Sequence, residues 1–364
     1  MADLFDNPLG TDGFEFVEFT GPDARALGDH FEKMGFTAVS RHRSKDVVRY
    51  KQGDINFLLN MEPTGQAADF RDARGPSANA MAFRVKDARL ALELALERGA
   101  KQVYGKVGQL ELDIPAIEGI GGSYLYLVDR YGAHEIYDID FVPIEGAEAK
   151  LGENSTGLTY LDHLTHNVHR GNMATWAGFY ERIFNFRQIR YFDIEGAQTG
   201  LFSKAMTSPD GKIRIPLNES QDEHSQIEEF LRNYKGEGIQ HLALGTDDIF
   251  HTVKTMGERG IGFQQTIDTY YEGIEARVPG HGEDVARMKA QNILIDGAPT
   301  EGQGLLLQIF TENAVGPIFF EIIQRKGNEG FGEGNFKALF ESLELDQIRR
   351  GVLPAQADKT RAGA

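Results

Sequence analysis

The chain opens with an alternation of apolar and polar residues that is typical of a β-strand. Residues 13–19 (GFEFVEF) alternate in this way, and residues 22–34 then carry apolar side chains at helical spacing. The same order of strand and helix returns at 80–85 and 87–98, at 158–168 and 172–183, and at 241–244 and 247–259. The pattern therefore predicts a repeated unit of strand followed by helix.

Two copies of a short motif fix the register of this repeat. The helix predicted at 87–98 runs into Glu97-Arg98-Gly99, and the helix predicted at 247–259 runs into Glu258-Arg259-Gly260, an offset of 161 residues (258 minus 97). Short strands are predicted to follow each helix, within 47–60, 122–141, 199–217 and 304–324. The chain is therefore predicted to have an α+β fold with four βαβββ modules in two similar domains, whose curled mixed sheets each surround a cleft.

A stretch rich in Gly and Glu separates the two predicted domains. Residues 144–157 (IEGAEAKLGENSTG) offer little to bury and several turn formers, so we expect domains at 1–150 and 151–364. Near the end, the glycine-punctuated segment 327–336 leads into a predicted helix at about 336–350 with Phe336, Phe340 and Leu343 on one stripe. This helix either packs on the core as an ordinary amphipathic helix or serves as a lid over a site.

Composition narrows the class of protein. The 364 residues are 41% hydrophobic, and no apolar run approaches the roughly 20 residues that cross a bilayer. A formal charge of −17 argues against nucleic acid and anionic membranes as partners. The chain has no Cys and no apolar export segment at its start, so we expect a cytoplasmic protein whose metal sites use nitrogen and oxygen ligands.

Histidines supply the first candidates for chemistry. His163, His166 and His169 lie close together, but His163 and His166 would point to opposite faces of a strand and cannot share one ion. A single such residue is more often a hydrogen-bonded or surface histidine than a ligand. The repeat strengthens the case for His163, because His241 begins the equivalent strand of the next module.

Glu321 is the third candidate, since it is a carboxylate within the apolar strand PIFFEIIQR (317–325). Burying it is costly unless it binds a cation or a partner. Arg325 on the same strand face offers the alternative, an ordinary ion pair. Two histidines and one carboxylate form a facial arrangement that leaves positions open on Fe(II) for a bidentate substrate and dioxygen.

The N-terminal half acts as an internal control. By the offset of 161 residues, Ala80 occupies the place of His241, and by strand order Phe16 stands near the place of His163. That half cannot assemble the same ligands. The metal site is therefore predicted in the second domain only.

Polar residues also interrupt apolar strand contexts in the second half. They are Ser203, Asn218, Gln226, Gln240 and Gln308. Taken one by one, a role in a turn or at a sheet edge explains each of them.

Four motifs together resemble a known family. LDHLTHNV (161–168), GIQHLAL (238–244), LLLQIFT (305–311) and FEIIQR (320–325), followed by GFGEGNF (330–336), resemble 4-hydroxyphenylpyruvate dioxygenases of the bacterial type. The resemblance covers nearly the whole chain and implies the vicinal-oxygen-chelate, or glyoxalase-like, fold, with its open barrels. One departure is Ser220, where many relatives have Pro.

The resemblance also implies the roles of individual residues. The family's metal ligands fall at His163, His241 and Glu321, the positions chosen above, and the metal is Fe(II). Asn218, Gln240 and Gln308 are implied to be catalytic. The implied substrate pocket consists of Ser203, Asn218, Gln226, Gln240 and Gln308 with aromatic walls from Phe310, Phe331, Phe336 and Phe340.

The implied reaction uses dioxygen to convert 4-hydroxyphenylpyruvate into homogentisate and carbon dioxide, a step of tyrosine and phenylalanine breakdown. Bacterial relatives imply a homo-oligomer, a tetramer. Two alternatives stay open from the sequence: 4-hydroxymandelate synthase, which hydroxylates the benzylic carbon of the same substrate, and a non-catalytic binding protein of this fold in which Glu321 pairs with Arg325.

Overall fold

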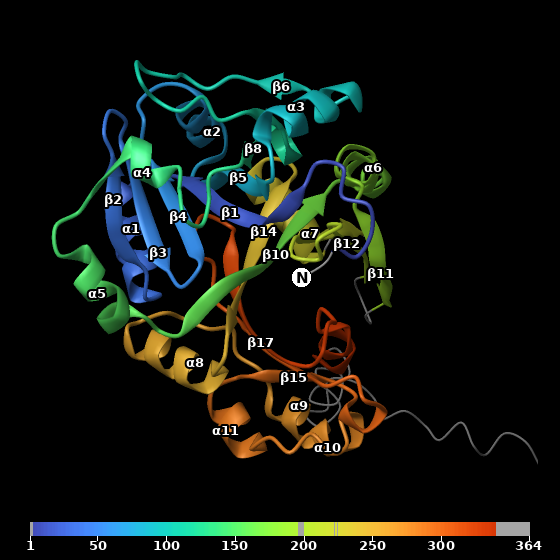
Figure 1. The fold of residues 1–364 in the computed structure, drawn as a ribbon. Coiled ribbons are helices and arrows are strands. Elements are labelled where there is room, and N and C mark those ends of the chain that lie inside the picture. The colour runs from blue at the N-terminus through green and yellow to red at the C-terminus, as the bar shows by residue number, and fades with distance from the viewer. Residues whose placement is uncertain (1–2, 196–199, 222, 224, 340–364) are drawn as a thin grey trace, which may run out of the picture.

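Two curled mixed sheets form the framework of the computed structural model, which describes residues 3–195, 200–221, 223 and 225–339 (Figure 1). The first sheet has nine strands in the order β6-β7-β8-β5-β1-β4-β3-β2-β9. Its strands are β1 (Thr11–Thr20), β2 (Thr37–His42), β3 (Val47–Gln52), β4 (Ile55–Asn60), β5 (Ser77–Val85), β6 (Gln102–Val103), β7 (Ala116–Glu118), β8 (Tyr124–Val128) and β9 (Phe141–Pro143).

The second sheet has eight strands in the order β11-β12-β13-β10-β14-β17-β16-β15. Its strands are β10 (Leu158–Val168), β11 (Arg187–Glu195), β12 (Gly200–Thr207), β13 (Arg214–Ser220), β14 (Gly238–Thr246), β15 (Leu294–Gly297), β16 (Leu305–Phe310) and β17 (Phe319–Lys326). An antiparallel pair lies at the centre of each sheet, β1 with β5 and β10 with β14. The two sheets thus repeat one topology.

Helices cover the outer faces of the sheets (Figure 1). They are α1 (Ala24–Lys33), α2 (Gln66–Arg74), α3 (Ala88–Glu97), α4 (Tyr137–Asp140), α5 (Ala147–Asn154), α6 (Met173–Phe184), α7 (Gln226–Tyr234), α8 (Ile249–Glu258), α9 (Asp268–Glu272), α10 (Ile274–Arg277) and α11 (Val285–Ala290), with short 3-10 turns at Ile120–Gly122 and Pro299–Glu301.

The predicted four modules are present. They are β1-α1-β2-β3-β4, β5-α3-β6-β7-β8, β10-α6-β11-β12-β13 and β14-α8-β15-β16-β17. The repeated Glu-Arg-Gly motif marks equivalent helix ends, because Gly99 after α3 and Gly260 after α8 both have positive φ, +86° and +88°. At the other end of α8, the side chain of Asp248 accepts a hydrogen bond from the backbone N–H of His251 as an N-cap.

The link between the sheets differs from the expectation. We predicted turns at 144–157, but helix α5 occupies Ala147–Asn154, because its alanines and Leu151 give the segment enough helix propensity to outweigh its glycines. One apolar core then joins the two halves, since Phe320 of β17 stacks on Phe57 of β4 with ring centroids 5.8 Å apart. At Gly53 (φ +55°) the chain passes so close to Thr159 that a Cβ would meet its carbonyl oxygen.

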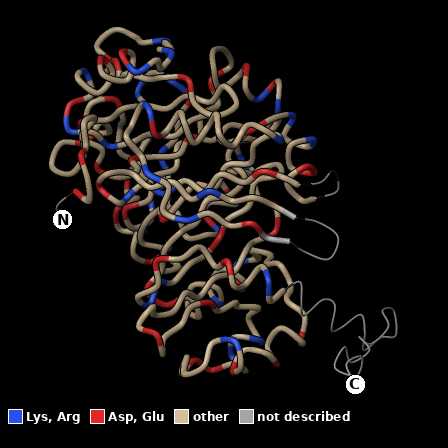
Figure 2. Tube along the Cα trace, turned by 90° about the vertical axis from the view of Figure 1, so that its right-hand side faces the viewer, with Lys and Arg blue, Asp and Glu red and all other residues tan. Residues whose placement is uncertain are grey.

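Acidic and basic residues are interspersed along the described part of the chain (Figure 2). Among the described residues, no helix combines the length and the apolar character needed to span a membrane.

Candidate metal centre and adjoining pocket

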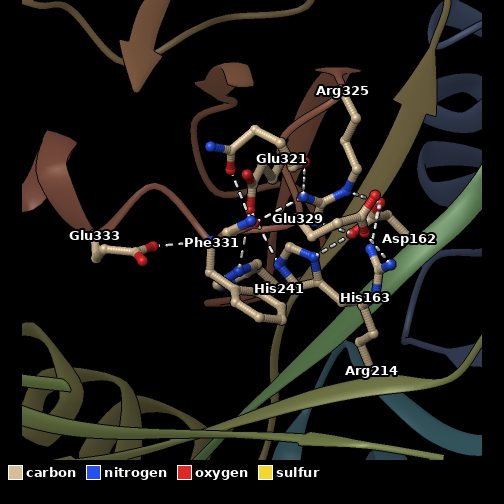
Figure 3. Close-up of polar contacts among 11 residues, drawn as sticks. Asp162, His163, Arg214, His241, Glu321, Arg325, Glu329, Phe331 and Glu333 are labelled. Carbon is tan, nitrogen blue, oxygen red and sulfur yellow. Dashed lines mark hydrogen bonds and ion pairs between the residues drawn. The ribbon is translucent and has the colours of Figure 1, made fainter. Parts of the chain in front are cut away.

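Three neighbouring strands bring His163, His241 and Glu321 together. Ala243 of β14 pairs with His163 of β10 on one side and with Glu321 of β17 on the other. His241 lies two residues before Ala243 on the same strand, so the register places the side chains of His163 and Glu321 close to that of His241. One ligand atom from each residue lies within 4.8 Å of the others. Oε2 of Glu321 is 3.3 Å from Nε2 of His163 and 3.4 Å from Nε2 of His241 (Figure 3).

The cluster is buried and strongly coupled. Burial raises the pKa of Glu321, but the charges and hydrogen bonds of His163 and His241 outweigh burial and lower that pKa to about 2. Burial lowers the pKa of His241, and Glu321 offsets only part of this effect. Burial also acts against protonation of His163, yet Glu321 and Asp162 raise its pKa above the usual value. Glu321 is therefore an anion at neutral pH.

The outer nitrogen of each histidine has its own hydrogen-bond partner. Nδ1 of His163 lies 2.8 Å from Oδ1 of Asp162, and Nδ1 of His241 lies 3.0 Å from Oε1 of Gln240. Both partner atoms are acceptors, so each Nδ1 carries a proton, and Nε2 is the atom that each ring would present to a cation in exchange for its proton.

This arrangement fits a metal ion. Nε2 of both histidines and a carboxylate oxygen converge on one point, where a cation could replace the Nε2 protons. In addition, Oε1 of Glu321 is buried without a hydrogen-bond partner among the described residues. The donor set of two imidazoles and one carboxylate suits a first-row divalent metal that keeps coordination positions open.

Arg325 does not pair with Glu321. Its Nε and Nη2 lie 2.7 and 2.8 Å from Oδ2 and Oδ1 of Asp162, a bidentate ion pair that uses the guanidinium elsewhere. Burial raises the pKa of Asp162, but the hydrogen bonds from Arg325 and His163 hold it well below its usual range. The alternative in which Arg325 neutralises Glu321 is therefore wrong.

Within the described part of the N-terminal half there is no equivalent cluster. Phe16 pairs with Ala82, and Ala82 with Tyr126, in the register that joins His163, Ala243 and Glu321 in the second sheet. Ala80 stands at the position of His241. Phe16 and Ala82 belong to an apolar cluster against which Tyr126 packs, so side chains fill the space that the metal centre occupies in the second half.

His166 points away from the metal centre, as strand alternation predicts. Its Nε2 lies 2.8 Å from the hydroxyl of Tyr180 on α6. Burial lowers the pKa of His166 to about 3, so this histidine is a neutral part of the core.

A pocket of about 390 Å³ opens beside the three candidate ligands. Four of the predicted polar residues line it: Ser203, Asn218, Gln226 and Gln240. Three of the predicted aromatic residues line it as well: Phe310, Phe331 and Phe336. Phe331 meets the ring of His163 edge-on at 5.3 Å between ring centroids, which places an aromatic wall against the metal centre (Figure 3).

Two of the predictions for this pocket need comment. Gln308 is covered by Gly332, which packs against its amide so closely that a Cβ at that glycine would overlap the Gln308 side chain, and its role in the pocket stays a prediction. Gln308 is only 1% exposed on β16. Phe340 lies outside the described residues, as does the predicted helix beyond residue 339, although residues 333–339 are helical.

The sequence interpretation missed about half of the lining. The additional residues are Thr165, Phe192, Leu201, Pro216, Ser225, Ile227, Gln264, Gln265, Thr266, Ile267, Phe319, Glu333 and Leu339. Strand alternation could have found Phe319, which lies two residues before Glu321 and stacks on His241 at 4.9 Å between ring centroids. The loop residues 264–267 follow α8 without any periodicity, so no pattern places them in the pocket.

Comparisons with known proteins agree with this architecture. Residues 5–142 match the family described as "Hydroxyphenylpyruvate dioxygenase, HPPD, N-terminal", and residues 160–278 match the "Glyoxalase/Bleomycin resistance protein/Dioxygenase superfamily". The chain is 63% identical to a 4-hydroxyphenylpyruvate dioxygenase of Pseudomonas aeruginosa, over 95% of this chain and 97% of that protein. It is 61% identical to Hemolysin VllY of Vibrio vulnificus, over 95% and 98% of the two chains.

Solved structures share the fold. A xylose isomerase-like TIM barrel/4-hydroxyphenylpyruvate dioxygenase fusion protein matches with a TM-score of 0.77 and 34% identity, over 93% of this chain and 54% of the fusion. A mutant of 4-hydroxymandelate synthase from Streptomyces coelicolor matches with a TM-score of 0.79 over 93% and 99% of the chains, but at 24% identity it supports the fold alone.

Proposed function

Because the chain belongs to the 4-hydroxyphenylpyruvate dioxygenase family, we propose that it converts 4-hydroxyphenylpyruvate and dioxygen into homogentisate and carbon dioxide. The atoms balance, since one dioxygen is consumed and one carbon dioxide is released. The observation that carries the proposal is the buried set of His163, His241 and Glu321 at one wall of a pocket large enough for a small aromatic acid.

We propose Fe(II) as the metal. His163 and His241 would bind it through Nε2, and Glu321 through a carboxylate oxygen. When bound, the iron supplies the activation of dioxygen and holds the 2-oxo acid group of the substrate. The lowered pKa of Glu321 supports this role, because the carboxylate remains charged for a cation throughout the neutral range.

The polar residues of the pocket would position the substrate. Ser203 and Asn218 pair across β12 and β13, so their side chains share one face of the sheet and reach the same part of the cavity. Gln226 approaches from the first turn of α7, and Gln240 lies next to the metal centre. We propose that these four residues bind the phenol and keto acid groups, and that Asn218, Gln240 and Gln308 belong to the catalytic machinery.

The aromatic residues would hold the ring and exclude water. Phe310 and Phe319 lie against His241, and Phe331 lies against His163, so apolar surface surrounds the open side of the metal centre. Excluding water matters because it protects a reactive site from side reactions such as hydrolysis and proton leakage. No protein general base is needed for this reaction, and the residues described act by binding, orientation and exclusion of solvent.

The proposal also covers the domain organisation, the location and the oligomeric state of the protein. We propose two domains at 1–150 and 151–364, which is supported by the separate sheets of β1–β9 and β10–β17. We propose a cytoplasmic homo-oligomer, a tetramer, on the basis of the bacterial relatives. Gel filtration with light scattering would test the oligomeric state.

Product identification tests the proposed function. The protein is reconstituted anaerobically with Fe(II), then given 4-hydroxyphenylpyruvate and oxygen, and the product is identified by mass spectrometry. Homogentisate from the wild type and none from His163→Ala would support the reaction and the metal centre together. Formation of hydroxymandelate instead would agree with the metal centre but reject homogentisate as the product. Iron binding without consumption of 4-hydroxyphenylpyruvate would reject the proposed substrate.

A further inference from the structure

Each candidate ligand histidine follows a β-bulge. Between β10 and β14, Leu161 pairs with Leu244 and His163 with Ala243, which leaves Asp162 as the extra residue. On the other strand, Thr165 pairs with His241 and His166 with Ile239, which leaves Gln240 as the extra residue. A bulge re-aims a side chain, and here it lets the residue just before each histidine reach that histidine's Nδ1, although strand neighbours normally point apart.

The two bulge residues differ in what holds them. Gln240 is a neutral amide that also lines the pocket. Asp162 is 1% exposed at its side chain, lies outside the pocket lining, and receives the two-pronged ion pair of Arg325, whose side chain is 9% exposed. Arg214 adds a weaker contact with Asp162 at 3.6 Å. A bidentate guanidinium fixes both the position and the orientation of a carboxylate.

The same guanidinium also holds the segment that closes the pocket. Nη1 of Arg325 donates hydrogen bonds to the carbonyl oxygens of Asn328 (2.9 Å) and Gly330 (2.7 Å). Its guanidinium carbon lies 5.8 Å from the ring centroid of Phe331, the residue whose ring packs edge-on against His163 (Figure 3). We call residues 327–336 the cover segment.

We propose that Asp162 and Arg325 are a positioning pair that couples the orientation of His163 to the closed arrangement of the cover segment. Arg325 fixes Asp162, Asp162 fixes the ring and the tautomer of His163, and Arg325 simultaneously anchors the backbone that carries Phe331. The inference rests on the proposed metal centre. It adds that His163 is the rigidly held ligand, whereas the orienting partner of His241 also faces the pocket.

The N-terminal half offers a matched control. Its sheet keeps the equivalent bulge with Glu15 as the extra residue, and Oε2 of Glu15 lies 2.6 Å from Nε of Arg84. This buried carboxylate also binds an arginine, but Phe16 follows it where a histidine follows Asp162. Losing the Glu15 ion pair therefore reports the purely structural cost of such a substitution.

The test measures Co(II) binding to the full-length metal-free protein through the visible absorption of the ion, together with hydrogen exchange of the cover segment. Asp162→Asn and Arg325→Lys are expected to weaken Co(II) binding about 10- to 100-fold, change the absorption spectrum and speed amide exchange over residues 327–336. Glu15→Gln is expected to lower thermal stability while the Co(II) affinity, the spectrum and cover-segment exchange stay as in the wild type.

The outcomes separate this inference from the proposed function. A wild type that binds no Co(II) would overturn the metal centre and the inference with it. If the wild type binds Co(II) and Asp162→Asn binds it with the same affinity and spectrum, the positioning role alone is overturned. If Asp162→Asn does not fold, Arg325→Lys provides the test of the positioning role, because this variant keeps the positive charge and loses only the bidentate ion pair with Asp162. A shift in affinity without faster exchange of the cover segment would reject the coupling.

Discussion

At the scale of single residues, the direction in which each side chain points decides its chemistry. His163 and His166 are three residues apart on one strand, and one faces the metal centre while the other bonds to Tyr180 in the core. Their environments push their pKa values in opposite directions, upward for His163 and down to about 3 for His166. Sequence spacing alone predicted this division, because strands have a period of two.

The first prediction concerns Glu321. Glu321→Gln removes the anionic ligand but keeps the size of the side chain, so we expect Fe(II) binding to weaken by more than about 100-fold while the fold is retained. Iron content after desalting and circular dichroism measure the two effects. Full iron content in the variant would contradict the assignment of Glu321 as a ligand.

The second prediction concerns His30 of α1, which stacks on Phe320 and whose buried Nε2 finds no hydrogen-bond partner in the described part of the chain. Burial, with a contribution from Lys33, lowers its pKa from 6.5 to about 4. Between these values the unfolded chain binds more protons than the folded chain, so stability falls as the pH falls through this window. Across this window the free energy of unfolding falls by about 1.4 kcal/mol for each pH unit, which is about 3 kcal/mol between pH 6.5 and pH 4.

Replacing His30 removes this titration. We expect the melting temperature of His30→Leu to exceed that of the wild type by a margin that grows from pH 6.5 to pH 4. Calorimetry at several pH values measures it, and His251→Gln, at an exposed position on α8, is the control. A constant margin across the window would show that His30 titrates normally in the folded protein.

At the scale of elements, the register between strands brings the metal centre together and the cover segment completes the pocket. The helix ends and the central strands were predictable, because caps such as Asp248 and motifs such as Glu258-Arg259-Gly260 are local signals. The bulges at Asp162 and Gln240 could not be predicted, because an extra residue in the pairing of two strands depends on the sequences of both strands. The exposure of Gln308 was equally beyond a local pattern, since it depends on the distant Gly332.

The third prediction tests the cover segment through Gly332. This residue has φ +75°, and a Cβ there would overlap the amide of Gln308. We expect Gly332→Ala to lift the cover segment, to lower kcat/KM by about 10-fold and to lower the melting temperature, because Gly332 is buried and its strain costs about 1–2 kcal/mol.

Gly327→Ala provides the matched control for Gly332→Ala. Gly327 has a similar φ of +85°, but its Cβ would come no closer than 3.7 Å to Gly304, so it tests backbone strain without the overlap. Steady-state kinetics of both variants separate the two causes. Equal losses in the two variants would assign the effect to backbone strain rather than to the contact with Gln308.

At the scale of the whole molecule, one βαβββ plan is used four times, and among the described residues only the second sheet carries a candidate metal centre. The repeat was visible in the sequence because each module repeats the same apolar pattern. The restriction of the site to one half was also visible, because Phe16 and Ala80 replace the two histidines. The packing of the two halves against each other could not be predicted from the sequence, since the contact of Phe57 with Phe320 joins residues far apart in the chain.

The last prediction concerns how the two halves respond to metal. Because Phe16, Ala80 and Tyr126 stand where the ligands stand in the second half, we expect each chain to bind a single ion. An ion at 100 times its dissociation constant stabilises the folded state by about 2.7 kcal/mol. The apolar core is continuous, including Val17 from the first sheet and Leu242 from the second, so this stabilisation should reach the half that binds no metal.

We therefore expect one calorimetric transition that moves to higher temperature as a whole when Co(II) is added, and no movement in the double variant His163→Ala/His241→Ala. Two transitions of which only one responds to Co(II) would show that the halves unfold independently and that their shared core does not couple them.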